Sequence, residues 1–169
     1  NFLRDPNIIT KIISCLEPKI GDEILEIGPG DGALTDQLVK RAAQIHAVEI
    51  DPFLVKYLTG KHYPNLILHQ VDFLDWDISI LSKAVKVVGN LPYYISSPIL
   101  FKLLESDQWE RMVLMFQKEV AQRIVSKPGT KTYGKLSVMC QVFCDVKIEF
   151  TVSKNVFQPK PDVDSAVLI

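Results

Sequence analysis

The sequence predicts an α/β fold with a doubly wound, mostly parallel β-sheet. Short apolar runs alternate with segments of helical periodicity through the first two-thirds of its 169 residues, which is the pattern of such sheets. The first apolar run, residues 24–27, passes through a glycine-rich turn into a helical segment, residues 33–39. Two later runs end in carboxylates, Glu49 and Asp72. Ligands of open α/β sheets bind at the carboxyl ends of the strands, so these features also predict where a site would lie.

The composition is that of an ordinary globular chain, with 47% hydrophobic and 23% charged residues. Its net charge of −1 excludes a protein that is basic overall, so nucleic-acid binding would require a local basic patch. The sequence shows no signal peptide and no long unbroken apolar segment, and we expect no membrane insertion. We expect one domain, residues 1–169, cut from a longer chain at both ends.

Three cysteines provide no disulfide framework, and their number suits a reducing cytoplasm. Cys140 and Cys144 lie one helical turn apart in an apolar run, and no further Cys or His stands nearby to complete a zinc site. We therefore expect a buried helix face there and no metal.

The first helix is expected to begin at Asp5 and Pro6, because Asp is a favoured N-cap and Pro a favoured first helical residue. Its apolar residues repeat at helical spacing as far as Leu16. After the glycine turn, a second strand is expected over residues 45–48, with Glu49 at its end.

The glycine turn predicts a nucleoside-cofactor site. Gly28, Gly30 and Ala33 fit the dinucleotide fingerprint with alanine in its last place. Glycine permits the tight turn and a close approach of the ligand, and the following helix directs free N–H groups at it. Glu49, 21 residues after Gly28, is placed to bind the hydroxyls of a ribose. This pattern alone leaves NAD, FAD and S-adenosylmethionine open as cofactors.

A short helix is expected to start at Pro52, and the third strand to cover residues 65–71 and close on Asp72. The apolar side of that helix is expected to comprise Phe53, Leu54, Tyr57 and Leu58. Asp72 could accept a hydrogen bond from the amino group of an adenine, or could instead be an N-cap or a solvated loop acid.

The second half of the chain continues the alternation. The expected elements are, in order, strand 84–88, a helix from Ser96, strand 112–116, helix 117–124, strand 148–152 and strand 165–169. Residues 136–144 fit either a helix or a strand. Prolines keep residues 156–161 extended.

Residues 90–93, Asn-Leu-Pro-Tyr, follow the fourth strand, and they distinguish between the possible cofactors and reactions. The Asn90 side-chain oxygen and a backbone carbonyl could both accept hydrogen bonds from one amine, and the Tyr93 ring could stack on a flat base. In isolation the pattern would also fit a capping Asn and a buried Tyr. Its place after three other strand ends with ligand-binding character favours a site that holds an exocyclic amine.

Residues 118–135 carry five basic side chains against one acid, Glu119, a local charge of +4. The five are Lys118, Arg123, Lys127, Lys131 and Lys135. They could contact RNA phosphates, or they could form a solvated helix and loop.

Residues 90–93 resemble the fourth motif of the amino-methyltransferases that act on adenine. The longer run 90–101 resembles the small-subunit ribosomal RNA adenine dimethyltransferase family. The chain is similar to that family in collinear order over essentially its whole length, at residues 1–3, 28–35, 116–120, 133–137 and 156–168.

The resemblance implies a Rossmann-like class I S-adenosylmethionine-dependent methyltransferase without a metal. It implies cofactor contacts at Asn1, Leu3, Gly28, Glu49, Asp72 and Asn90. It also implies that the target amine and base are held by Asn90, Leu91, Pro92, Tyr93 and Phe157. Tyr93 and Phe157 would sandwich the base.

The implied activity is dimethylation of the exocyclic amine of adenosines in small-subunit (16S) rRNA, linked to ribosome biogenesis. The implied partner is small-subunit rRNA within the immature small ribosomal subunit, and the protein is expected to be a cytoplasmic monomer. The family also carries a Gln before the position of Asn1 and a helical domain after that of Ile169, and neither is in this sequence.

Two other classes of protein stay open. An NAD-dependent oxidoreductase would use Gly28 and Glu49, but would give residues 90–93 and Phe157 no role. A non-catalytic RNA-binding or ribosome-assembly protein would keep the fold without the chemistry.

Overall fold

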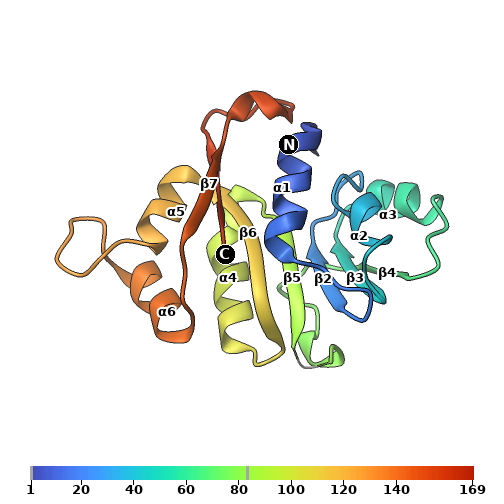
Figure 1. Ribbon diagram of the computed structural model, residues 1–169, viewed down its shortest axis with the longest axis horizontal. Coiled ribbons are helices and arrows are strands. Elements are labelled where there is room, and N and C mark those ends of the chain that lie inside the picture. Colours follow the sequence, from blue (N-terminus) through green and yellow to red (C-terminus); the bar gives the residue numbers. More distant parts are fainter. Residues whose placement is uncertain (1, 83) are drawn as a thin grey trace.

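The computed structural model describes residues 2–82 and 84–169, and within them it places a central seven-stranded sheet (Figure 1). The strand order is β4 (Leu66–Gln70), β3 (Gln44–Glu49), β2 (Glu23–Ile27), β5 (Val85–Asn90), β6 (Trp109–Gln117), β9 (Ser165–Leu168) and β7 (Ile148–Val152). The first five of these strands are parallel, and β9 is antiparallel to both of its neighbours. The sheet is therefore mostly parallel, as predicted.

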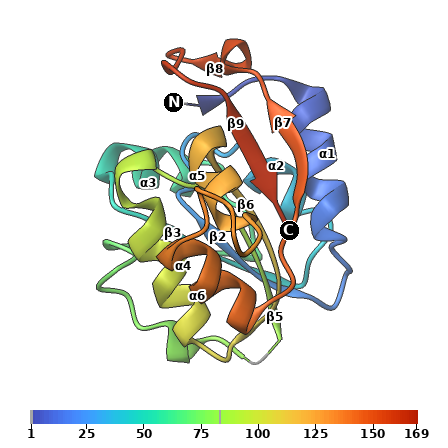
Figure 2. The same ribbon diagram turned by 90° about the vertical axis from the view of Figure 1, so that its left-hand side faces the viewer.

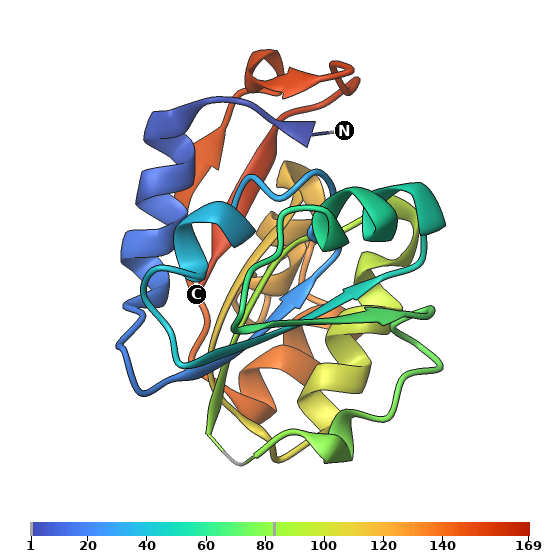
Figure 3. The ribbon, with the colours of Figure 1, turned by 90° about the vertical axis from the view of Figure 1, so that its right-hand side faces the viewer.

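Helices cover both faces of this sheet. The α-helices are α1 (Pro6–Leu16), α2 (Thr35–Leu38), α3 (Pro52–Thr59), α4 (Ser96–Glu105), α5 (Lys118–Ile124) and α6 (Lys135–Phe143), and the 3-10 helices are η1 (Ile78–Ile80), η2 (Tyr93–Ile95) and η3 (Lys154–Val156). In the edge-on view of Figure 3, α1 and α2 lie on one side of the sheet and α4 and α6 on the other, and Figure 2 views the same layers from the opposite edge. The doubly wound arrangement is thereby confirmed.

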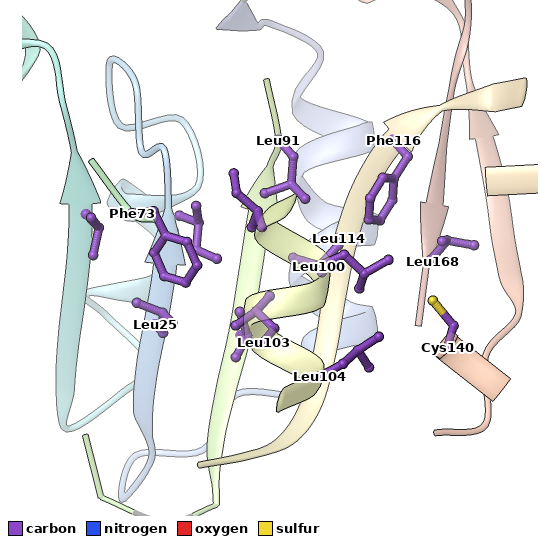
Figure 4. Packing of buried hydrophobic residues seen from close by; sticks show 14 of the residues in the cluster. Leu25, Phe73, Leu91, Leu100, Leu103, Leu104, Leu114, Phe116, Cys140 and Leu168 are labelled. Atoms are coloured by element: carbon purple, nitrogen blue, oxygen red, sulfur yellow. The ribbon is translucent and has the colours of Figure 1, made fainter. Parts of the chain in front are cut away.

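Two buried apolar clusters, one on each face, hold the layers together. In the first, Leu100, Leu103 and Leu104 of α4 pack onto β5 and β6 (Figure 4). Cys140 of α6 belongs to the same cluster. In the second, α1 and α2 bury the residues Ile12, Ile13, Leu16 and Leu38. Burial of apolar area at about 25 cal/mol per Å² is the main stabilising term for such layers.

The helix starts follow the local signals in the sequence. The Asp5 carboxylate accepts hydrogen bonds from the backbone N–H groups of Asn7 (2.8 Å) and Ile8 (3.2 Å), and Pro6 is the first helical residue. Asp51 caps α3 in the same way through the N–H of Phe53 (2.8 Å). Caps of this kind contribute about 1 kcal/mol each.

The predicted apolar side of α3 is wrong for two of its four residues, Phe53 and Tyr57. Phe53 is 82% exposed and Tyr57 is 55% exposed, whereas Leu58 is buried. The helix lies at the edge of the sheet, against β3 and β4, so only one narrow stripe of it meets the core. The sequence pattern identified the helix but overestimated how much of it is covered.

The ambiguous segment 136–144 is a helix, α6. Cys140 is buried in the core, and Cys144 is partly buried at the end of α6. Burial raises the pKa of the Cys140 thiol to about 12, so this sulfur is a packing group at neutral pH.

A second, two-stranded sheet pairs β1 (Phe2–Leu3) with β8 (Phe157–Gln158) in antiparallel register. Neither strand was predicted from the sequence. Among the described residues, no helix is both long enough and apolar enough to cross a membrane.

Candidate active site

The glycine turn leaves the carboxyl end of β2, between β3 and β5, where the strand order of the sheet reverses. Gly28 and Gly30 have φ angles of +65° and +60°, which residues other than glycine rarely adopt. The Gly28 N–H donates to the carbonyl of Val48 on β3 at 3.0 Å. On the other side, a Cβ atom at Gly28 would lie 3.9 Å from the carbonyl oxygen of Asn90 on β5. The turn thus lies against both neighbouring strands.

Glu49 ends β3 with its carboxylate held in place by two backbone groups. The N–H of Gly30 donates to one carboxylate oxygen at 3.2 Å, and the N–H of Asp51 donates to the other at 3.0 Å. The residue is only 8% exposed. Each oxygen keeps a further lone pair, so the group is oriented and can still accept hydrogen bonds from a ligand.

One pocket brings together three of the predicted cofactor contacts, Gly28, Glu49 and Asp72, with Pro92 of the 90–93 turn. Its remaining walls are apolar or aromatic, and they are formed by Ile27, Val48, Ile50, Val71, Phe73, Tyr94, Ile95 and Ile99. Carboxylates at one rim and apolar walls elsewhere suit a ribose and a flat base.

The capping interpretation of Asp72 is confirmed, and its contact with the amino group of an adenine stays a prediction. One carboxylate oxygen accepts a hydrogen bond from the N–H of Leu74 at 2.9 Å, which caps the turn after β4. The same side chain lines the pocket with Glu49. Asp72 is therefore fixed locally and faces the place where a ligand would lie.

The turn over residues 90–93 is anchored at both ends. The Leu91 N–H donates to the carbonyl of Met115 on β6 at 3.4 Å, and the Leu91 side chain is 1% exposed in the core (Figure 4). Only the backbone of Leu91 is thus available to a ligand. The Tyr93 hydroxyl shares a hydrogen bond of 2.7 Å with the hydroxyl of Ser165 on β9. This bond fixes the edge of the tyrosine ring.

Phe157 and Leu3 are placed together but outside the pocket. They are partners in the β1–β8 ladder, and they are 5% and 4% exposed within the same buried cluster. The predicted contact of Phe157 with a target base stays a prediction, and so does the predicted cofactor contact of Leu3. The predicted contact at Asn1 lies outside the described residues.

Glu26, two positions before the turn, was not predicted from the sequence to be a functional residue. Glu26 is 1% exposed, and the Thr35 hydroxyl at the start of α2 donates to its carboxyl group at 2.7 Å. Burial, with smaller contributions from the nearby charges of Asp36 and Glu49, raises the pKa of Glu26 to about 7. A charged residue flanked by the apolar residues Leu25 and Ile27 within the strand was the signal that could have identified it.

The basic residues of 118–135 lie on α5, on the start of α6 and on the loop between them (Figure 1). Arg123 pairs with Glu119 at 2.6 Å. A hollow is lined by Arg123, Lys131 and Lys135 together with Tyr133. In residues 2–82 and 84–169, no group of three or more His, Cys, Asp or Glu side chains is arranged to hold a metal ion.

A sequence model of the family described as "Ribosomal RNA adenine dimethylase" matches residues 1–169. The chain belongs to the ribosomal RNA adenine dimethylase family. A ribosomal RNA small subunit methyltransferase A from Aromatoleum aromaticum is 46% identical over 99% of this chain and 64% of its own length. The chain spans between 60% and 65% of the length of such curated relatives.

Solved structures agree with this membership of the ribosomal RNA adenine dimethylase family. A dimethyladenosine transferase from Plasmodium falciparum is 33% identical with a TM-score of 0.91, over 99% of this chain and 62% of that one. The 23S rRNA methyltransferase ErmE is 34% identical with a TM-score of 0.86, over 99% and 68%. The fold is that of the Rossmann-like class I S-adenosylmethionine-dependent methyltransferases, as predicted.

Proposed function

We propose that residues 1–169 form the S-adenosylmethionine-binding catalytic domain of an enzyme that dimethylates the exocyclic amine of adenosines in small-subunit (16S) rRNA. The observation that carries the proposal is the pocket that joins Gly28, Glu49 and Asp72 to Pro92 of the turn over residues 90–93. Membership of the ribosomal RNA adenine dimethylase family supports the choice of substrate.

The chemistry of the pocket fits this cofactor. The two carboxylates accept hydrogen bonds, Glu49 from the ribose hydroxyls and Asp72 from the adenine amine. The apolar walls cover the faces of the base. When bound, the cofactor supplies a methyl group on a sulfonium, which is already a strong electrophile. The protein's task is therefore to position the acceptor amine.

Residues 90–93 hold the target. The side-chain oxygen of Asn90 and the backbone carbonyl of Leu91 accept hydrogen bonds from the adenosine amine, and this contact stabilises the positive charge that develops on the nitrogen. The Tyr93 ring, fixed through Ser165, stacks on the base. Unstacking the base from RNA costs a few kcal/mol, and each aromatic contact returns about 1–3 kcal/mol. Phe157 is the proposed second ring; it is 5% exposed at the β1–β8 ladder, so it must be uncovered before it can stack on a base.

This geometry does not support the oxidoreductase alternative, because that alternative gives no role to residues 90–93, of which Pro92 lines the pocket. An assembly role without catalysis leaves the joint placement of Glu49, Asp72 and Pro92 unexplained. The methyltransferase accounts for all of them.

Replacing Asp72 by asparagine is expected to weaken S-adenosylmethionine binding by about tenfold, the effect of one lost charge-assisted hydrogen bond. Asparagine keeps an oxygen that can accept from the Leu74 N–H, so the turn is preserved. Calorimetric titration with S-adenosylmethionine, and with NADH in parallel, measures the effect.

Asp77→Asn is the matched control for this titration, because Asp77 makes the same kind of contact, to the N–H of Ser79 at 3.0 Å, outside the pocket. Binding of NADH alone by the unmodified chain would overturn the proposed cofactor. Equal affinities of the two variants for S-adenosylmethionine would show that Asp72 does not contact the cofactor.

Reversing two loop charges, Lys127→Glu with Lys131→Glu, is expected to weaken binding of 16S rRNA and to flatten its salt dependence. Each lost phosphate contact lowers the slope of log K against log salt by about 0.7–0.9. Filter binding over a salt series measures the slope.

Lys19→Glu with Lys40→Glu is the control for the loop variant, since both lysines are exposed and the net charge changes equally. An unchanged slope in the loop variant would exclude residues 118–135 from the RNA interface.

The proposed partner is the immature small ribosomal subunit, with the protein acting as a cytoplasmic monomer. Support for the partner comes from the RNA-modifying relatives and from the basic hollow beside α5 and α6. Sedimentation of the protein alone and with unmethylated small subunits tests both its monomeric state and its partner, and a stable dimer would contradict the former.

A further inference from the structure

The N-terminal strand, β1, contacts both β8 and the glycine turn. β1 pairs with β8, so that Leu3 is opposite Phe157 and Phe2 is opposite Gln158 (Figures 2 and 3). The Arg4 N–H extends this ladder by donating to the carbonyl of Val156 at 2.9 Å. Residues 2–4 therefore hold the segment that carries the proposed base-stacking ring.

The same three residues contact the glycine turn. The Arg4 guanidinium pairs with the Asp31 carboxylate at 2.5 Å, and the two side chains are 52% and 22% exposed. The Phe2 ring lies so close to Gly30 that a Cβ atom there would be 3.1 Å from it. The guanidinium also lies 5.5 Å from the centre of the Phe2 ring. Residues 2–4 thus join β8 to the turn by one ionic and one apolar contact.

The glycine turn also contacts the carboxylate of Glu49, the proposed ribose contact. Gly30, which Phe2 covers, donates its N–H to Glu49 at 3.2 Å. Contacts therefore run without a break from Phe157 through residues 2–4 to Asp31 and Gly30, and then to Glu49. The two ends of this route are the proposed base contact and the proposed cofactor contact.

We propose that Arg4 and Asp31 are positioning residues whose ion pair couples cofactor binding to ordering of the β1–β8 ladder, which carries Phe157. The inference rests on the proposed function and adds cooperativity between its two substrates. A cofactor that holds the glycine turn fixes Asp31, and Asp31 then holds Arg4 and the ladder. RNA that binds next has less ordering entropy to lose. By linkage, RNA strengthens cofactor binding by the same factor.

The coupling is measured with the full chain by titrating S-adenosylhomocysteine, which cannot react, in the presence and absence of unmodified 16S rRNA transcript. The ratio of the two dissociation constants is the coupling factor. Arg4→Gln and Asp31→Asn are each expected to lower this factor by about two- to fivefold, the range for a partly exposed ion pair. The effect in the unmodified chain is expected to shrink at high salt.

The reversed pair, Arg4→Asp with Asp31→Arg, is expected to restore the coupling factor, which a merely structural role for either residue would not do. Lys147→Gln is the matched control, because it breaks another exposed ion pair, to Glu149 at 3.0 Å, outside the route. An unchanged coupling factor in Arg4→Gln and Asp31→Asn overturns the proposal, even where their thermal stability falls. A chain that binds the cofactor and RNA but transfers no methyl group would contradict the proposed function while leaving the coupling measurable.

Discussion

Replacing Asn90 by alanine is expected to lower the rate of methyl transfer to 16S rRNA by about 10²–10³-fold, with cofactor affinity nearly unchanged. Removing one preorganised polar group that acts on developing charge has an effect of this size. The glycine turn faces the backbone carbonyl of Asn90, which alanine retains, so the cofactor side of the site is preserved. Single-turnover methylation and calorimetry with S-adenosylhomocysteine separate the two effects.

Two further variants make the Asn90 experiment decisive. Asn90→Asp keeps an acceptor oxygen at the same place and is expected to retain more activity than Asn90→Ala. Asn7→Ala removes an exposed asparagine on α1 and is expected to have no effect. Full activity in Asn90→Ala would refute the role of Asn90 in holding the amine. An equal loss of cofactor affinity in Asn90→Ala would show that Asn90 acts mainly in cofactor binding.

The convergence of Gly28, Glu49 and Asp72 was predictable because it follows from topology. Each residue ends a strand or follows its end by one or two residues, and the carboxyl ends of parallel strands meet at one edge of the sheet. The helix starts were predictable for a different reason, since caps such as Asp5 act over only three residues. Features that depend on short-range signals, or on the direction of the strands, can thus be derived from the sequence.

The β1–β8 ladder could not be derived in this way. Each strand has only two residues, and Leu3 and Phe157 are brought together by the folding of everything between them. No local propensity signals such a pair. The same is true of the bond between Tyr93 and Ser165, which depends on β9 lying beside β6. Long-range pairing therefore supplies the part of the candidate site that the sequence did not predict.

Replacing Glu26 by glutamine is expected to stabilise the protein at pH 8 by about 3 kcal/mol and to have little effect near pH 4.5. The pKa of Glu26 is about 7 in the folded chain, against 4.5 as its ordinary value. Below both values the group is protonated whether the chain is folded or not. As pH rises toward 7, the unfolded chain loses this proton while the folded chain keeps it, so stability falls. The loss is complete above the folded pKa, and glutamine, which cannot ionise, avoids it.

Urea denaturation of the two proteins at pH 5 and at pH 8 measures this difference, with Glu110→Gln as the exposed control. A difference in stability that does not grow with pH would contradict the raised pKa. Glutamine keeps an oxygen that can accept from the Thr35 hydroxyl, so the bond between the strand before the glycine turn and the first residue of the helix after it is retained. A gain in stability at pH 8 would therefore be assigned to the lost ionisation of the carboxyl group and not to a changed contact.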